Sequence, residues 1–69
     1  MITVIDPLGN PVQLNFQTGM TTAQALEAAQ VSAGRLDIVL ADQMVVPPPY
    51  ETEAADESTI RVLRIVSGG

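Results

Sequence analysis

The sequence contains no cysteine, no histidine and no lysine. The missing cysteine excludes disulfides and thiolate zinc sites, and the missing histidine removes the usual general base near pH 7. Without cysteine or lysine, the chain also lacks a thiol nucleophile and a Schiff-base amine. Because the Ser, Thr, Asp, Glu and single Tyr residues show no catalytic spacing, we expect no intrinsic enzymatic activity, no cofactor and no metal site.

Positive charge is also scarce. Arg35, Arg61 and Arg64 stand against eight acidic residues, which gives a net charge of −5. Such a surface disfavours nucleic acid and anionic membranes as partners. No apolar run approaches the roughly 18 residues of a membrane span, and the sequence from Met1 to Val4 lacks the basic region of a signal peptide. The sequence therefore predicts a cytoplasmic protein that binds neither nucleic acid nor membrane.

The first part of the chain predicts a hairpin. Residues 1–5 are mostly β-branched and apolar, and residues 6–10 are rich in the turn formers Asp, Pro, Gly and Asn. Val12, Leu14 and Phe16 then alternate with polar residues, which indicates a strand with one buried face. Sixty-nine residues allow one small domain, so this hairpin must share its core with the rest of the chain.

A helix is predicted to begin after Thr21. Thr21 and Gln24 have the spacing of a capping box, and Met20 precedes the cap as a hydrophobic staple would. Alanines and Leu26 favour about three turns, with Gly34 as the predicted stop. The small apolar face of this helix requires a sheet to pack against.

Three further strands are predicted, at residues 38–40, 44–46 and 60–66, the last being the longest. Pro47-Pro48-Pro49 ends the second of these, because proline cannot donate to a strand ladder. A polar loop with four acids, residues 51–58, precedes the last strand. The order predicts an α+β fold with a mixed sheet of four to five strands and one helix packed on one face. The crossover rule allows the strand after the helix to run parallel to an earlier one.

The last residues are Gly68 and Gly69. At average glycine usage two terminal glycines arise by chance in roughly 0.5% of chains. A carboxylate at the end of a segment without side chains can enter a narrow active site, because no Cβ blocks the approach. We therefore divide the chain into a domain of residues 1–66 and a flexible reactive tail of residues 67–69. The alternative is an incidental frayed terminus.

The chain resembles the β-grasp sulfur carriers and their ubiquitin-like relatives, most of all the small bacterial carriers of thiamine and molybdopterin biosynthesis. The likeness covers the whole chain and rests on the following segments: Ile38–Leu40, Ala41–Gln43, Met44–Pro47, Asp56–Ser58, Thr59–Val62 and Ile65–Gly69. Two departures are the Asp56-Glu57-Ser58-Thr59 sequence, where the family often has Gly-Asp, and the triple proline. Only Gly68-Gly69 is a specific motif.

The resemblance implies that an E1-like ATP-dependent enzyme adenylates the carboxylate of Gly69, with Gly68 as a spacer. A sulfur donor then converts the adenylate to a thiocarboxylate, from which a synthase takes the sulfur. ATP, magnesium and zinc chemistry would belong to these partners. The alternatives are a ubiquitin-like modifier, conjugated through Gly69 to target lysines, and a β-grasp interaction module that does not react.

The last strand indicates where a partner docks. Ile60, Val62 and Arg64 share one face by alternation, and Arg61, Leu63 and Ile65 share the other. If the first face meets the helix, Leu63 lies on the open face, where the family docks its activating enzyme. We therefore predict a partner-binding segment comprising Arg61, Leu63, Ile65 and Ser67. The alternative is a reversed register, with Leu63 in the core.

Residues 47–50 also match the Pro-Pro-x-Tyr pattern that WW domains bind in a polyproline helix. The competing interpretation is structural: the prolines end a strand and stiffen a loop, while Tyr50 packs over the sheet edge.

Overall fold

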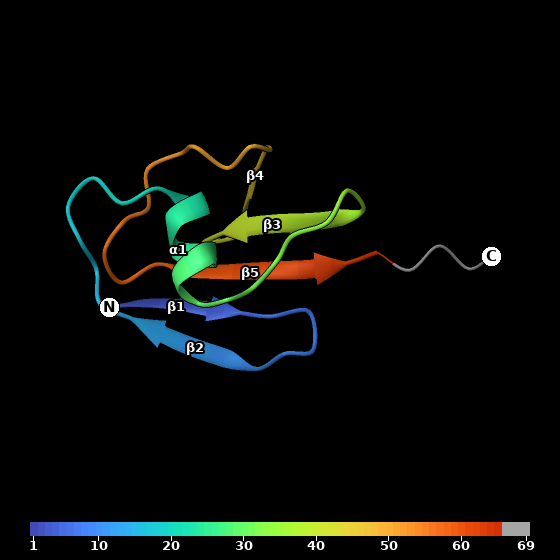
Figure 1. Ribbon diagram of the computed structural model, residues 1–69, viewed down its shortest axis with the longest axis horizontal. Coiled ribbons are helices and arrows are strands. Elements are labelled where there is room, and N and C mark those ends of the chain that lie inside the picture. The colour runs from blue at the N-terminus through green and yellow to red at the C-terminus, as the bar shows by residue number, and fades with distance from the viewer. Residues whose placement is uncertain (66–69) are drawn as a thin grey trace.

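The computed structural model describes residues 1–65, which form one helix and a five-stranded sheet (Figure 1). The strands are β1 (Ile2–Ile5), β2 (Pro11–Leu14), β3 (Asp37–Ala41), β4 (Met44–Val46) and β5 (Thr59–Arg64), and helix α1 spans Thr22–Ala28. The α+β class is confirmed and each predicted element is present, although β2 ends at Leu14, before Phe16, and β5 ends at Arg64, before Ile65. In the described chain β5 is the longest strand.

The sheet is mixed, with the strand order β2-β1-β5-β3-β4. The central strands β1 and β5 are parallel, whereas the pairs β1–β2, β3–β4 and β3–β5 are antiparallel. It follows that β2 and β3, which flank α1 in the sequence, run in the same direction with two strands between them. The chain therefore places its last strand in the middle of the sheet, where both neighbours hold it.

Helix α1 covers one face of the sheet and leaves the other open (Figure 1). The core lies between α1 and the strands, and its buried apolar residues are Ile2, Val4, Ala25, Leu26, Ala29, Val39, Val46, Ile60 and Val62. β-Branched side chains supply all of the strand positions in this group, as expected for residues that pack on a pleated surface. No core residue lies beyond Val62 in the described chain.

The predicted capping box is present at the start of α1. The Thr21 hydroxyl accepts the N–H of Gln24 at 3.2 Å, and the Gln24 side chain accepts the N–H of Thr21 at 2.9 Å. The loop before β5 supplies a further partner, because the Thr22 N–H and hydroxyl both donate to the Thr52 carbonyl, at 2.8 and 3.1 Å. The loop is thus tied to the first turn of the helix.

The predicted helix end is wrong, because α1 stops at Ala28 rather than near Gly34. Gln30 adopts a left-handed conformation with φ 60°. The Gln30 N–H donates to the Glu27 carbonyl and the Val31 N–H donates to the Leu26 carbonyl, which closes the helix with a Schellman motif. Glutamine is an unusual residue for this position, so composition favoured a longer helix. Within residues 1–65, no helix has the length and apolar character needed to cross a membrane.

Asp6 organises the turn between β1 and β2. Its carboxylate accepts the N–H of Leu8 at 2.9 Å and the N–H of Asn10 at 2.8 Å. The pKa of Asp6 lies below its ordinary value of 3.8, mainly because the Asn10 N–H bonds to the charged carboxylate. The carboxylate therefore helps to fix the hairpin register.

A pH dependence follows from this lowered pKa. The stabilisation by Asp6 is present above the ordinary pKa of 3.8 and is lost as the pH falls through the lowered folded-state value. We expect Asp6→Asn to be slightly less stable than the wild type at neutral pH, with the difference vanishing in acid. Urea unfolding of both proteins across the acid range measures this, and a difference independent of pH would contradict it.

Candidate functional site

The open face of the sheet carries the residues that alternate with the core. They include Ile5 on β1, Ile38 and Leu40 on β3, Val45 on β4, and Arg61 and Leu63 on β5. Leu63 is 42% exposed, Ile65 just beyond it is 51% exposed, and Val45 is 67% exposed. Because Ile60 and Val62 are buried at 0% and 1% exposure, the register is the predicted one and Leu63 is not part of the core. The open-face patch is our name for the six residues Ile5, Ile38, Leu40, Val45, Arg61 and Leu63.

The strand register places the members of the patch side by side. Leu63 lies opposite Ile38 on β3. Arg61 lies opposite Leu40 on β3 and opposite Ile5 on β1, so that an apolar residue flanks it on each side. Cross-strand neighbours of this kind are within side-chain reach of one another. The patch is therefore apolar with one cation among its members.

Asp42 lies near Arg61 but bonds to the backbone of β5. Asp42 in the β3–β4 turn lines the same shallow depression as Arg61, together with Leu40 and Thr59. Its carboxylate accepts the N–H of Thr59 at 3.0 Å, which ties the turn to the start of β5. In the part of the chain that the structure describes, Arg61 forms no ion pair.

Arg64 is held in a different way. It shares the face of β5 that carries Ile60 and Val62. Its Nε donates to Asp37 Oδ1 at 3.4 Å. The Asp37 side chain is only 5% exposed, and its other oxygen accepts the N–H of Gly34 at 2.7 Å. These bonds fasten the C-terminal end of β5 to the loop before β3. An open pocket beside this end is lined by Ser32, Gly34, Arg35, Leu36, Asp37, Arg64 and Ile65.

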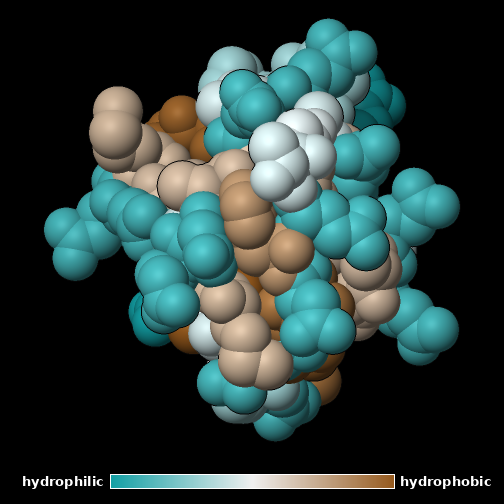
Figure 2. Space-filling view, turned by 90° about the vertical axis from the view of Figure 1, so that its left-hand side faces the viewer, coloured by the Kyte–Doolittle hydropathy of each residue, from teal (hydrophilic) through white to brown (hydrophobic). Residues whose placement is uncertain are grey.

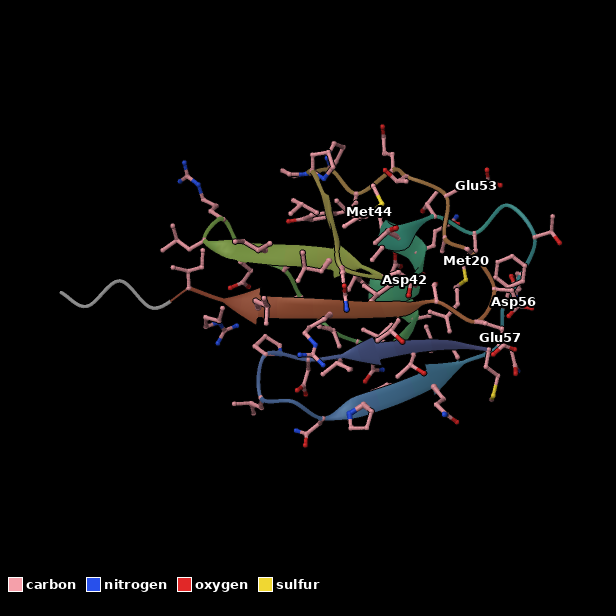
Figure 3. All side chains as sticks on the ribbon, turned by 180° about the vertical axis from the view of Figure 1, so that it is seen from behind. Met20, Asp42, Met44, Glu53, Asp56 and Glu57 are labelled. Carbon is pink, nitrogen blue, oxygen red and sulfur yellow. The ribbon has the colours of Figure 1, made fainter. Side chains whose placement is uncertain are left out.

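Acidic side chains gather at the opposite end of the molecule. Asp56 and Glu57 lie where β1 begins and Glu53 lies near the start of α1, all away from the C-terminal end of β5 (Figure 3). This end of the molecule is mostly hydrophilic, with a narrow apolar strip between the polar side chains (Figure 2). Two of the three arginines, Arg35 and Arg64, line the pocket at the other end. The charge is therefore unevenly distributed along the molecule.

The predicted reactive residues Ser67, Gly68 and Gly69 lie outside the described residues, as does the predicted boundary between residues 1–66 and 67–69. The structure places the other three predicted residues, Arg61, Leu63 and Ile65, on exposed positions along one strand and just past its end. These three are therefore accessible at the point where the chain continues toward Gly69.

The proline segment is part of the scaffold. Pro47, Pro48 and Pro49 are exposed, but Tyr50 is half-buried and packs against the core. The Tyr50 carbonyl accepts the N–H of Ala23 at 2.8 Å, which connects the segment to α1. Among residues 1–65, no three acidic side chains come together in a group able to hold a metal ion.

The sequence did not reveal the apolar neighbours of Leu63 on the open-face patch. Residues 38–40 are all apolar, so alternation within that segment does not distinguish Ile38 and Leu40 from the buried Val39. The pairing of Leu63 with Ile38 depends on register, for which the sequence holds no local signal. The bond between Arg64 and Asp37 joins residues 27 positions apart and was missed for the same reason.

Comparisons with protein-family models, curated proteins and solved structures gave no significant match.

Proposed function

We propose that this chain is a β-grasp sulfur carrier whose Gly69 carboxylate is adenylated by an E1-like enzyme and converted to a thiocarboxylate. The observation that carries the proposal is the Gly68-Gly69 sequence, which follows the central strand of the sheet by a few residues. The strand order β2-β1-β5-β3-β4 with a single helix is compatible with a β-grasp, which supports the same reading.

The proposed chemistry activates a carboxylate that is unreactive by itself. A C-terminal carboxyl group has a pKa near 3.5, so it is an anion at neutral pH and a poor electrophile. Attack of its oxygen on the α-phosphorus of ATP expels pyrophosphate and leaves an acyl adenylate. A sulfur nucleophile then adds to the carbonyl carbon and AMP departs, which leaves a thiocarboxylate on Gly69. The carrier supplies the reacting group, and the partner supplies the catalytic residues.

The division of roles within the carrier follows from the geometry. The open-face patch offers Leu63 for docking, Ile65 is exposed just beyond β5, and the bonds of Asp37 to Arg64 and Gly34 anchor the strand that leads to the tail. From Ser67 to Gly69, an extended chain spans about 10 Å at roughly 3.3–3.6 Å per residue. That length is enough for the reacting carboxylate to enter a recessed site while the folded domain stays outside.

The absence of cysteine makes the test specific. An organomercury reagent in a gel retards proteins that carry a thiol or a thiocarboxylate sulfur, and this chain has no thiol. We expect the protein to be retarded only after incubation with its activating enzyme, ATP and a sulfur donor. A protein that is adenylated but never retarded would contradict the carrier function.

The absence of lysine leads to a further expected result. A branched chain of the ubiquitin type needs an acceptor ε-amine on each unit, and this sequence offers none. We therefore expect activation reactions to give no lysine-linked polymer of the protein. Denaturing gels and peptide mass spectrometry measure this, and polymers linked through the Met1 amine, or conjugates to lysines of other proteins, would favour the modifier function instead.

A further inference from the structure

We propose that Arg61 selects the partner of the open-face patch, and that this partner presents an apolar surface with a carboxylate opposite Arg61. The inference rests on the proposed function, because it takes the activating enzyme as the occupant of the patch. It adds the chemistry of the enzyme surface and the residue of this chain that recognises it.

Arg61 lies among apolar residues on the open face. Its neighbours across the sheet are Ile5 and Leu40, and Leu63 follows two residues later on the same face. A partner that covers Leu63 and Leu40 must also cover the guanidinium of Arg61, which is next to both on the same face, or at least restrict its access to water. Burying an unpaired charge is costly, so a purely apolar partner surface would bind this patch poorly.

The cation on this face is an arginine, whose side chain is suited to pairing with a carboxylate. Arginine has a planar guanidinium whose fork of N–H donors matches a carboxylate, and it is less strongly hydrated than lysine. A paired carboxylate turns the cost of covering Arg61 into a charge-assisted hydrogen bond. Among the described residues, no acid of this chain forms an ion pair with Arg61, and Asp42, in the same depression, uses Oδ1 to accept the Thr59 N–H.

The charge of the open-face patch differs in sign from the net charge of the chain. The chain has a net charge of −5, yet the described strand positions of the open-face patch include Arg61 and no acid. Two copies that met through this face would each bring a cation without an opposing carboxylate, and their net charges would repel. A second copy is therefore a poor occupant, and an acidic residue on a different protein is the complementary group.

Three variants of Arg61 test the inference. Association of the full chain with the activating enzyme of the same organism is measured as separate on and off rates. We expect Arg61→Lys to lose part of the affinity, because an ammonium cannot reproduce the fork of donors, Arg61→Leu to weaken association at least about tenfold, and Arg61→Glu to weaken it at least about a hundredfold. The loss should appear mainly as faster dissociation, because a covered ion pair acts on the off rate.

Arg35 provides the matched control. It is exposed and lies off the open face, in the loop before β3, so Arg35→Leu and Arg35→Glu each change the net charge as much as the matching substitution of Arg61. We expect these variants to alter the on rate modestly and the off rate little. Thermal unfolding of all variants should match the wild type, since both side chains are exposed.

Four results would overturn the inference. Arg61→Leu binding as tightly as the wild type would mean an apolar partner surface, and Arg61→Glu binding more tightly would mean a basic one. Equal losses at Arg35 and Arg61 would mean general charge attraction. A change in oligomeric state on substitution of Arg61 would identify a second copy as the occupant. A wild-type chain that the enzyme does not adenylate would instead refute the proposed function, and with it the occupant named here.

Discussion

Deletion of Gly69 is expected to reduce adenylation at least about a hundredfold while leaving the fold intact. The deletion draws the carboxylate back by about 3.3–3.6 Å, the length of one extended residue. A displacement of only 1 Å in an active site can cost about a hundredfold in rate. The fold should survive because Gly69 has no side chain and, among residues 1–65, no core residue lies beyond Val62. ATP–pyrophosphate exchange by the activating enzyme and thermal unfolding of the variant measure the two effects.

Replacement of Gly69 by Ala is the companion variant. It keeps the length of the chain and adds a Cβ, so a sharp loss of adenylation would show that the site tolerates no side chain at this position. The protein without Gly69 should still bind the enzyme through the open-face patch and compete with the wild type. Normal activation of the deletion variant would refute the role of Gly69.

The second large effect is expected for Leu63→Asp. Under the proposed function, docking would bury Leu63, and full burial of such a side chain contributes about 1.5–3 kcal/mol. Loss of that contribution should weaken association at least about tenfold, since about 1.4 kcal/mol corresponds to that factor. The free energy of unfolding should change by about 1 kcal/mol or less, because Leu63 is already 42% exposed in the free protein.

Two further substitutions act as controls for Leu63→Asp. Ile60→Asp places a carboxylate at a fully buried position on the same strand, so it should prevent folding. Met44→Asp makes a comparable change at a position on edge strand β4 that is 74% exposed and alternates with Val45, off the open face. It should leave association within about twofold of the wild type. A Leu63→Asp protein that folds and binds normally would place the docking surface elsewhere.

Much of the fold was predictable because the local signals agreed with the packing. Alternation in the last strand placed Ile60 and Val62 on one face, which the structure shows to be the buried one, and the cap formed by Thr21 and Gln24 set the start of α1. The end of α1 was not predictable, since Gln30 adopts a left-handed conformation that glycine usually provides. Secondary structure was thus predictable wherever the residue type is one that usually adopts the backbone conformation found at that position.

The candidate site was predictable only in part, because its composition depends on pairing between distant strands. Leu63 emerged from the alternation of one strand, whereas its neighbour Ile38 and the flanking of Arg61 by Ile5 and Leu40 emerged only from the register. A single sequence contains the members of such a surface but not their contacts. The Asp37–Arg64 bond was missed for the same reason, because it joins the first residue of β3 to the last residue of β5, which meet only in the folded chain.

The most direct test is the mass of the C-terminal peptide of the protein isolated from its own cells. Oxidation of any of the three methionines adds an oxygen atom and changes the intact mass by nearly as much as replacement of oxygen by sulfur. Trypsin cleavage after Arg64 removes this ambiguity, because the peptide of residues 65–69 contains no methionine.

The account predicts that part of this peptide, in cells making the sulfur-containing product, is heavier by the difference between one sulfur and one oxygen atom. Fragmentation should place that difference on Gly69. A peptide that is always unmodified, that is joined to a lysine of another protein, or that continues beyond Gly69 would contradict the proposal that Gly69 is a sulfur-carrying terminus.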